Sequence, residues 1–218
     1  MRIWLTIVLL TLASPLAAHE PEVPEPETVA EAAPQEGQPG PEIAVPALHW
    51  DEQRPGMVAP ADPEWGVALM TAIAAEGEML ETVPADIEAW CPAYAAAAPD
   101  QRAAFWGGLV SVLAWYESTH NPRAIGGGGR WFGLVQIAPA TARHRGCEVG
   151  SGQALLNAGD NLRCGVRIMA QNVVRDRVVS RDLRGVAAEW GPFYSRPRRE
   201  AMRDWVRSQD YCAVAEAG

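Results

Sequence analysis

Two spacings that usually mark zinc sites, C-x-x-C and H-x-x-H, are missing from the sequence, although it has four cysteines and four histidines. We therefore expect no metal. Alternating apolar and polar residues, the pattern of half-buried strands, are scarce, and no segment repeats. These absences favour a mainly α-helical domain, with at most a small β element near residues 130–137.

The N-terminus lacks an apolar run long enough to cross a bilayer, which takes roughly 20 residues. Residues 3–12 are apolar, follow the single positive charge of Arg2, and precede Pro15 and two alanines at 17–18. This layout is typical of a secretory signal peptide, here residues 1–18, although an uncleaved membrane anchor is the alternative. No cysteine lies at the expected cleavage site, so we expect no lipid anchor. We predict export to the periplasm or beyond.

Residues 19–64 contain much of the proline and almost no periodic aliphatic residues. Such a chain cannot bury enough apolar surface to offset the entropy of ordering it, so we predict a disordered linker. It carries eleven acidic residues against Arg54 alone. The whole chain has a net charge of −9 and Arg2 adds one positive charge, so residues 65–218 are neutral. A nucleic-acid-binding surface is therefore not expected. The acidic linker suggests that the domain extends on this tether from an envelope assembly partner.

The four cysteines are an even number in a chain that we expect to be exported, which favours disulfides over free thiols. Three pairings are possible. We favour Cys147–Cys164, which closes a local loop, together with Cys91–Cys212, which ties the end of the chain to an early helix.

Helical periodicity begins at Trp65, and we expect one domain over residues 65–218. The clearest helix runs from Gln101 to about Ser118, after Pro99-Asp100. The other expected helices cover about 68–80, 86–91, a start at Pro139, 161–178 capped by Asp160, 182–190 and 197–208.

Glu117 stands at the end of this helix, whose sequence is otherwise apolar. Beside Trp115 and Tyr116 its carboxyl would be partly desolvated, which raises a carboxyl pKa and suits a general acid. The alternative is a solvated glutamate at a helix end. A negative charge is mildly unfavourable there, which suggests that the position was not chosen for helix stability.

The sequence after Glu117-Ser118 carries further motifs. Asn121-Pro122 is followed by a glycine loop, then by Gly133-Leu134-Val135-Gln136-Ile137 and Pro139-Ala140-Thr141-Ala142. Together with Asp160-Asn161-Leu162 and Gly165, this order resembles the soluble lytic transglycosylase (SLT) domain, over roughly residues 100–195.

The resemblance implies a lysozyme-like helical fold that cleaves the β-1,4 bond between N-acetylmuramic acid and N-acetylglucosamine in peptidoglycan, without metal or cofactor. In that family one glutamate is acid and then base, and the muramyl 6-hydroxyl closes a 1,6-anhydro ring in place of water. By position Glu117 would be the acid/base. Ser118 would form a hydrogen bond near the bound sugar or peptide stem, and Gln136 would help to place the sugar at the scissile bond. Gly133 has no Cβ and would allow the backbone to be approached closely. Alternatively, the Ser118 hydroxyl could hydrogen-bond to its own backbone. The Gln136 amide could simply lie on the surface.

The sequence departs from the family late in the chain, where an Ala-x-Tyr-Asn element usually places a tyrosine on the catalytic glutamate. Here the nearest match is Ala187-Ala188-Glu189-Trp190-Gly191-Pro192. Trp190 or Tyr194 could replace the tyrosine. Alternatively, Glu189 could supply a second carboxylate beside Glu117 and favour attack by water, as in a hydrolytic muramidase; it could also simply face solvent.

The leading hypothesis is thus a monomeric peptidoglycan lytic transglycosylase. A hydrolytic muramidase is the second, and a wall-binding module that has lost catalysis is the third.

Overall fold

The computed structural model describes residues 44–214, which form mainly helices and one small hairpin, as predicted. The α-helices are α1 (Pro63–Ala74), α2 (Gly77–Glu81), α3 (Ile87–Trp90), α4 (Pro99–Ser118), α5 (Pro139–His144), α6 (Ala158–Asp176) and α7 (Arg196–Arg207). Strands β1 (Ile125–Gly126) and β2 (Trp131–Phe132) pair antiparallel. Short 3-10 helices are η1 (His49–Asp51), η2 (Tyr94–Ala96), η3 (Ala154–Leu156), η4 (Gly185–Ala188), η5 (Gly191–Tyr194) and η6 (Asp210–Cys212).

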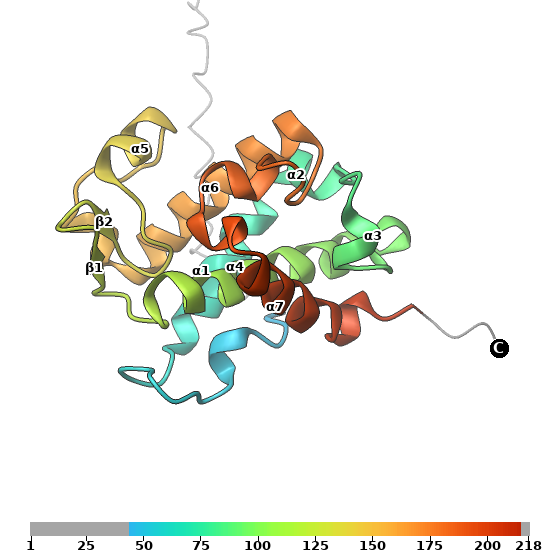
Figure 1. Cartoon of the computed structure of the whole chain (residues 1–218), viewed down its shortest axis with the longest axis horizontal. Helices are drawn as coiled ribbons and strands as arrows, with labels where there is room; N and C mark the ends of the chain where they lie inside the picture. The colour runs from blue at the N-terminus through green and yellow to red at the C-terminus, as the bar shows by residue number, and fades with distance from the viewer. Residues whose placement is uncertain (1–43, 215–218) are drawn as a thin grey trace, which may run out of the picture. The chain divides into compact units, whose positions relative to one another are not determined.

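Helix α4 is the central element of the domain and packs against α1, α7 and η1 (Figure 1). Its side chains at 105, 106, 109 and 113 are fully buried, at the three- and four-residue steps expected of a core helix. Pro99 occupies the first turn, where the missing N–H costs nothing. The helix was predicted from residue 101, and its end at Ser118 is as predicted.

Some predicted boundaries were wrong. The helix expected over 68–80 is two helices, α1 and α2, and α1 begins at Pro63 because Asp62 caps it by accepting from Glu64 N. The cap of α6 is Asn157, whose Oδ1 accepts from Asp160 N at 3.0 Å, not Asp160 itself. Over 182–190 only the short η4 forms.

The folded part also begins earlier than the predicted boundary at residue 65. Leu48, His49 and Trp50 are buried, and His49 N donates to Ser111 Oγ on α4 at 2.9 Å. These apolar and aromatic side chains pack on α4, which corrects the linker prediction for this part of 19–64. The predicted signal peptide and the linker up to residue 43 lie outside the described residues.

Two disulfides join distant parts of the domain. Cys91 bonds Cys212 across 121 positions, and Cys147 bonds Cys164 across 17. These are the two pairings favoured from the sequence. Between residues 44 and 214 no helix is long and apolar enough to cross a membrane.

Candidate active site

Glu117 lies in the last turn of α4, half-buried. The helix ends immediately afterwards because Thr119 adopts a left-handed backbone, with φ of 53°. Burial raises the pKa of Glu117 to about 7, and the Arg198 guanidinium on α7 partly opposes this rise. A carboxyl with this pKa is about half protonated at neutral pH, so it can donate a proton and then accept one back.

Ser118 follows Glu117 and is buried, and its hydroxyl bonds the local backbone. Its Oγ donates to Ala114 O at 3.1 Å and accepts from Asn121 N at 3.2 Å. This is the geometry of the alternative considered for Ser118, in which the hydroxyl stabilises the helix end. The bonds hold the chain as it turns from α4 toward the hairpin.

Gln136 ties the two sides of the hairpin together. Its Nε2 donates to Ala124 O at 3.2 Å and to Gly133 O at 2.9 Å, while its backbone φ is 50°. Gly133 N also donates to Ala124 O, at 2.9 Å. The amide predicted to place a sugar therefore also fixes the loop that follows Glu117.

Gly133 has a φ of 79°, which favours glycine, and lies against α6. A Cβ at this position would overlap Asn161 Nδ2 and Leu155 O. The close approach that requires glycine is thus to the protein's own helix.

Asn161 on α6 is the positioning residue that sequence reasoning missed. It is fully buried, accepts from Val135 N at 2.9 Å, and donates to Phe132 O at 2.9 Å and Leu155 O at 3.0 Å. A buried amide with all three bonds satisfied fixes the hairpin segment on α6. The sequence signal was its place in the Asp160-Asn161-Leu162 motif, to which we had assigned no role.

The three candidates in residues 189–194 lie in different surroundings. Trp190 is buried and its Nε1 donates to Val135 O at 2.9 Å, so it supports the hairpin segment from within the core. Glu189 forms an ion pair with Arg145 at 3.3 Å, with both side chains about three-quarters buried or more. Tyr194 is 57% exposed. Glu189 is thus neither free in solvent nor unpaired.

His49 and His120, which the sequence did not suggest as neighbours, are both buried against α4. The Nδ1 of His49 lies 3.4 Å from the Nε2 of His120, and that Nε2 is 3.0 Å from Ser111 O. Burial lowers the pKa of His120 to about 4 and that of His49 to about 3, so both are neutral at pH 7. They hold η1 on α4, and His120, with φ of 58°, lies in the turn that follows this helix.

Across the described part of the chain, no three His, Cys, Asp or Glu side chains gather as a metal site.

Comparison with known proteins identifies the segment that holds Glu117 and the hairpin. Residues 95–178 match the family model described as Transglycosylase SLT domain. This match covers 84 of the 218 residues, so it is a similarity of this segment to SLT domains. No curated protein matches the chain.

Solved structures of a protein named Bd0314 DslA share the fold. Its wild-type form 2 is 22% identical, with a TM-score of 0.67, over 78% of this chain and 100% of DslA. A DslA mutant with a glutamate changed to glutamine is 24% identical, with a TM-score of 0.62, over 69% of this chain and 91% of that one. The likeness covers more of the chain than residues 95–178, so the fold shared with DslA is larger than the segment that matches the family model.

Proposed function

We propose that this protein is a peptidoglycan lytic transglycosylase that cleaves the β-1,4 bond between N-acetylmuramic acid and N-acetylglucosamine. The observation that carries the proposal is Glu117: a half-buried carboxyl with a pKa of about 7, at the end of the central helix of an SLT domain. The two disulfides support an exported protein that meets its substrate in the periplasm or outside the cell.

In the proposed reaction Glu117 has two successive roles. Protonated Glu117 gives its proton to the glycosidic oxygen as the bond from that oxygen to muramyl C1 breaks. The resulting carboxylate then takes the proton of the muramyl 6-hydroxyl while that oxygen bonds to C1. The products are a free sugar hydroxyl and a 1,6-anhydromuramyl end, and Glu117 is protonated again. Arg198 stabilises the carboxylate between the two steps.

The other candidate residues then position the reaction. We assign Ser118, Gln136 and Gly133 to the backbone turn that lies beside the bound sugar. Trp190 supports this turn through Val135. Tyr194 is exposed and free to contact the glycan. A monomer suffices for this arrangement, and the acidic linker would reach an envelope partner.

A single-carboxylate mechanism is favoured over a hydrolytic muramidase by the surroundings of Glu189. Its carboxylate is paired with Arg145, and the shift of the Glu117 pKa comes from burial and Arg198. The guanidinium of Arg145 thus occupies the carboxylate that a hydrolytic mechanism would need for binding a water molecule. The retained acid at Glu117 also argues against a wall-binding module without catalysis.

Mass spectrometry of the released fragments tests the proposed product. Purified wall digested with the protein should yield 1,6-anhydromuramyl ends, which are lighter than hydrolysed reducing ends by one water. Reducing ends as the main product would instead identify a muramidase, and no released fragments would identify a binding module.

Replacing Arg198 by alanine should shift the alkaline limb of the pH–activity profile to higher pH. The reaction needs protonated Glu117, so the rate falls as pH rises through about 7. Removing the guanidinium removes the charge that lowers this pKa, so the carboxyl stays protonated to higher pH. Initial rates of wall solubilisation between pH 5 and 9 measure the shift. Arg196→Ala is the matched control, because Arg196 pairs with Glu200; an equal shift in both variants would contradict the assignment to Arg198.

A further inference from the structure

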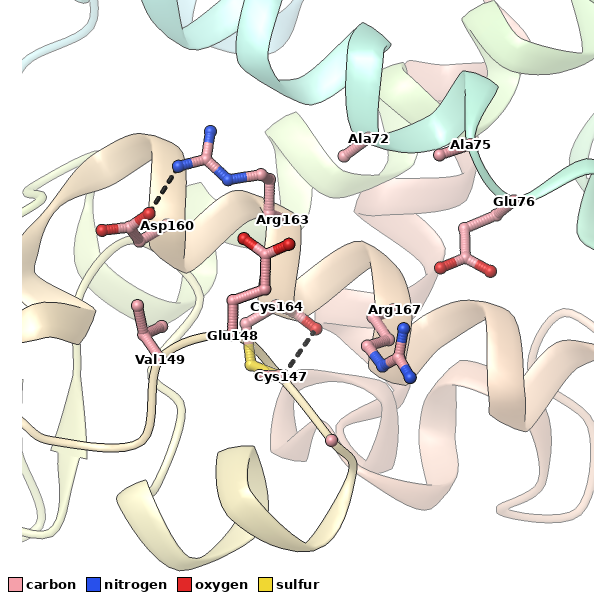
Figure 2. Close-up of a pocket in the computed structure, with 11 residues that line it drawn as sticks. Ala72, Ala75, Glu76, Cys147, Glu148, Val149, Asp160, Arg163, Cys164 and Arg167 are labelled. Carbon is pink, nitrogen blue, oxygen red and sulfur yellow. Dashed lines mark hydrogen bonds and ion pairs between the residues drawn. A yellow bond between two sulfur atoms is a disulfide. The ribbon is translucent and has the colours of Figure 1, made fainter.

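A concave site lies between the end of α1, the loop at 146–149 and α6 (Figure 2). The cavity measures about 150 Å³. Ala72, Ala75, Val149 and the Cys147–Cys164 disulfide form its apolar part. None of its lining residues comes from α4, the hairpin or α7, so it is separate from the surroundings of Glu117.

Charged side chains surround this apolar part. Arg163 and Asp160 neutralise each other in an ion pair (Figure 2). Glu76, Glu148 and Arg167 also line the cavity, and within residues 44–214 none of these three forms an ion pair. The cavity therefore presents two carboxylates and one guanidinium that lack a counter-charge in direct contact.

The guanidinium is held in place although it has no carboxylate partner. Arg167 Nε donates to Arg145 O at 3.0 Å, which leaves its terminal nitrogens for a ligand. Gly146 lies against it, since a Cβ there would come 3.3 Å from Arg167 Nη2. Burial raises the pKa of Glu76 and the Arg167 charge lowers it, so the two groups interact across the cavity. A guanidinium fork whose terminal nitrogens are open to a ligand is suited to bidentate binding of a carboxylate.

We propose that this cavity binds the zwitterionic end of an amino acid, a carbon that carries both an ammonium and a carboxylate. The ligand carboxylate lies on Arg167, its ammonium lies between Glu76 and Glu148, and a short aliphatic chain covers Ala72, Ala75 and the disulfide. Each charge of the ligand then meets an opposite charge that the protein leaves without an ion-pair partner.

The source of this ligand rests on the proposed function. Wall stem peptides that contain a diamino acid and are not cross-linked expose such an end, and they accompany the glycan that Glu117 would cleave. Free D-amino acids carry the same group. Binding of a stem at this second site would hold uncross-linked strands on the enzyme.

The test uses the full-length Glu117→Gln protein, which binds without cleaving, titrated with D-alanine and followed by backbone amide NMR. Saturable shifts are expected in residues 146–149 and 163–167. N-acetyl-D-alanine lacks the ammonium and D-alanine amide lacks the carboxylate, so each should bind about tenfold more weakly or worse. Tighter binding of meso-diaminopimelate than of D-alanine would identify the stem as the source, and equal binding would identify free amino acids.

Variants locate the site. Arg167→Gln and Glu76→Gln should each weaken D-alanine binding about tenfold, whereas Glu81→Gln, an exposed glutamate on the neighbouring α2, should not. Absence of saturable shifts, or equal affinity for D-alanine and its two blocked analogues, would overturn the proposal whether or not the variants fold. A wild-type protein that fails to release wall fragments would overturn the proposed function instead and leave this binding unaffected.

Discussion

Replacing Glu117 by glutamine is expected to lower the rate of wall cleavage by about 10²- to 10⁴-fold, the usual contribution of a general acid. Glutamine keeps the size and the hydrogen-bonding shape of the side chain but has no proton to give to the glycosidic oxygen. The mutation therefore removes the chemical step while it leaves the helix end and the hairpin in place. Zymography on purified wall, followed by quantified release of soluble fragments, measures the loss.

The matched control is Glu88→Gln, an exposed glutamate on α3, which should clear the gel like the wild type. Equal clearing by wild type and Glu117→Gln would show that another group donates the proton. Loss of clearing in both variants would point to a general effect of the substitution rather than to Glu117.

The free energy of unfolding of the same variant also tests whether the Glu117 carboxyl is buried. The folded-state pKa of Glu117, about 7, lies above the ordinary value of 4.5, so the unfolded state loses its proton first as pH rises. Glu117 therefore makes its full contribution to the free energy of unfolding below pH 4.5. This contribution, about 3 kcal/mol, is lost as pH rises through about 7. Glutamine carries no such loss. Urea unfolding should find Glu117→Gln more stable than the wild type at pH 8 and equal at pH 4.

The sequence predicted those features that depend on local pattern. The apolar spacing of α4, the end of that helix at Glu117-Ser118 and the small β element are all present in the structure. Each is set by residues close together in the chain, through side-chain period and through residues that end a helix. The functional reading of Glu117 needed the motif at 133–137 as well, since a helix-end glutamate alone is common.

Features that depend on distant contacts were missed or misassigned. Gly133 was expected to be required for close approach of substrate. In the structure a Cβ at this position would overlap Asn161, which lies 28 positions later in the chain. Glu189 was expected either beside Glu117 or in solvent, and its actual partner is Arg145. The burial of Trp50 on α4 was also missed, because a proline-rich, acidic composition dominates the segment around it. Composition averages over a segment, whereas one aromatic side chain is enough to fix it to a core.

Removing the Cys91–Cys212 disulfide by changing both cysteines to alanine should lower the free energy of unfolding by about 5 kcal/mol. The bond spans 121 positions, so in the chain-entropy model it restricts most of the unfolded domain. Domains of this kind have about 5–15 kcal/mol of stability, so the variant should be partly or wholly unfolded at 37 °C. Urea unfolding at low temperature, followed by circular dichroism, measures the difference.

The matched comparison is removal of Cys147–Cys164 in the same way, which should cost about 3 kcal/mol because that loop spans only 17 positions. The two losses should therefore differ in the order of their loop lengths. A larger loss from the short loop would contradict the entropic account. It would mean that the 146–149 loop depends on its disulfide for its folded shape, and the cavity beside it should then lose its affinity for D-alanine together with the bond.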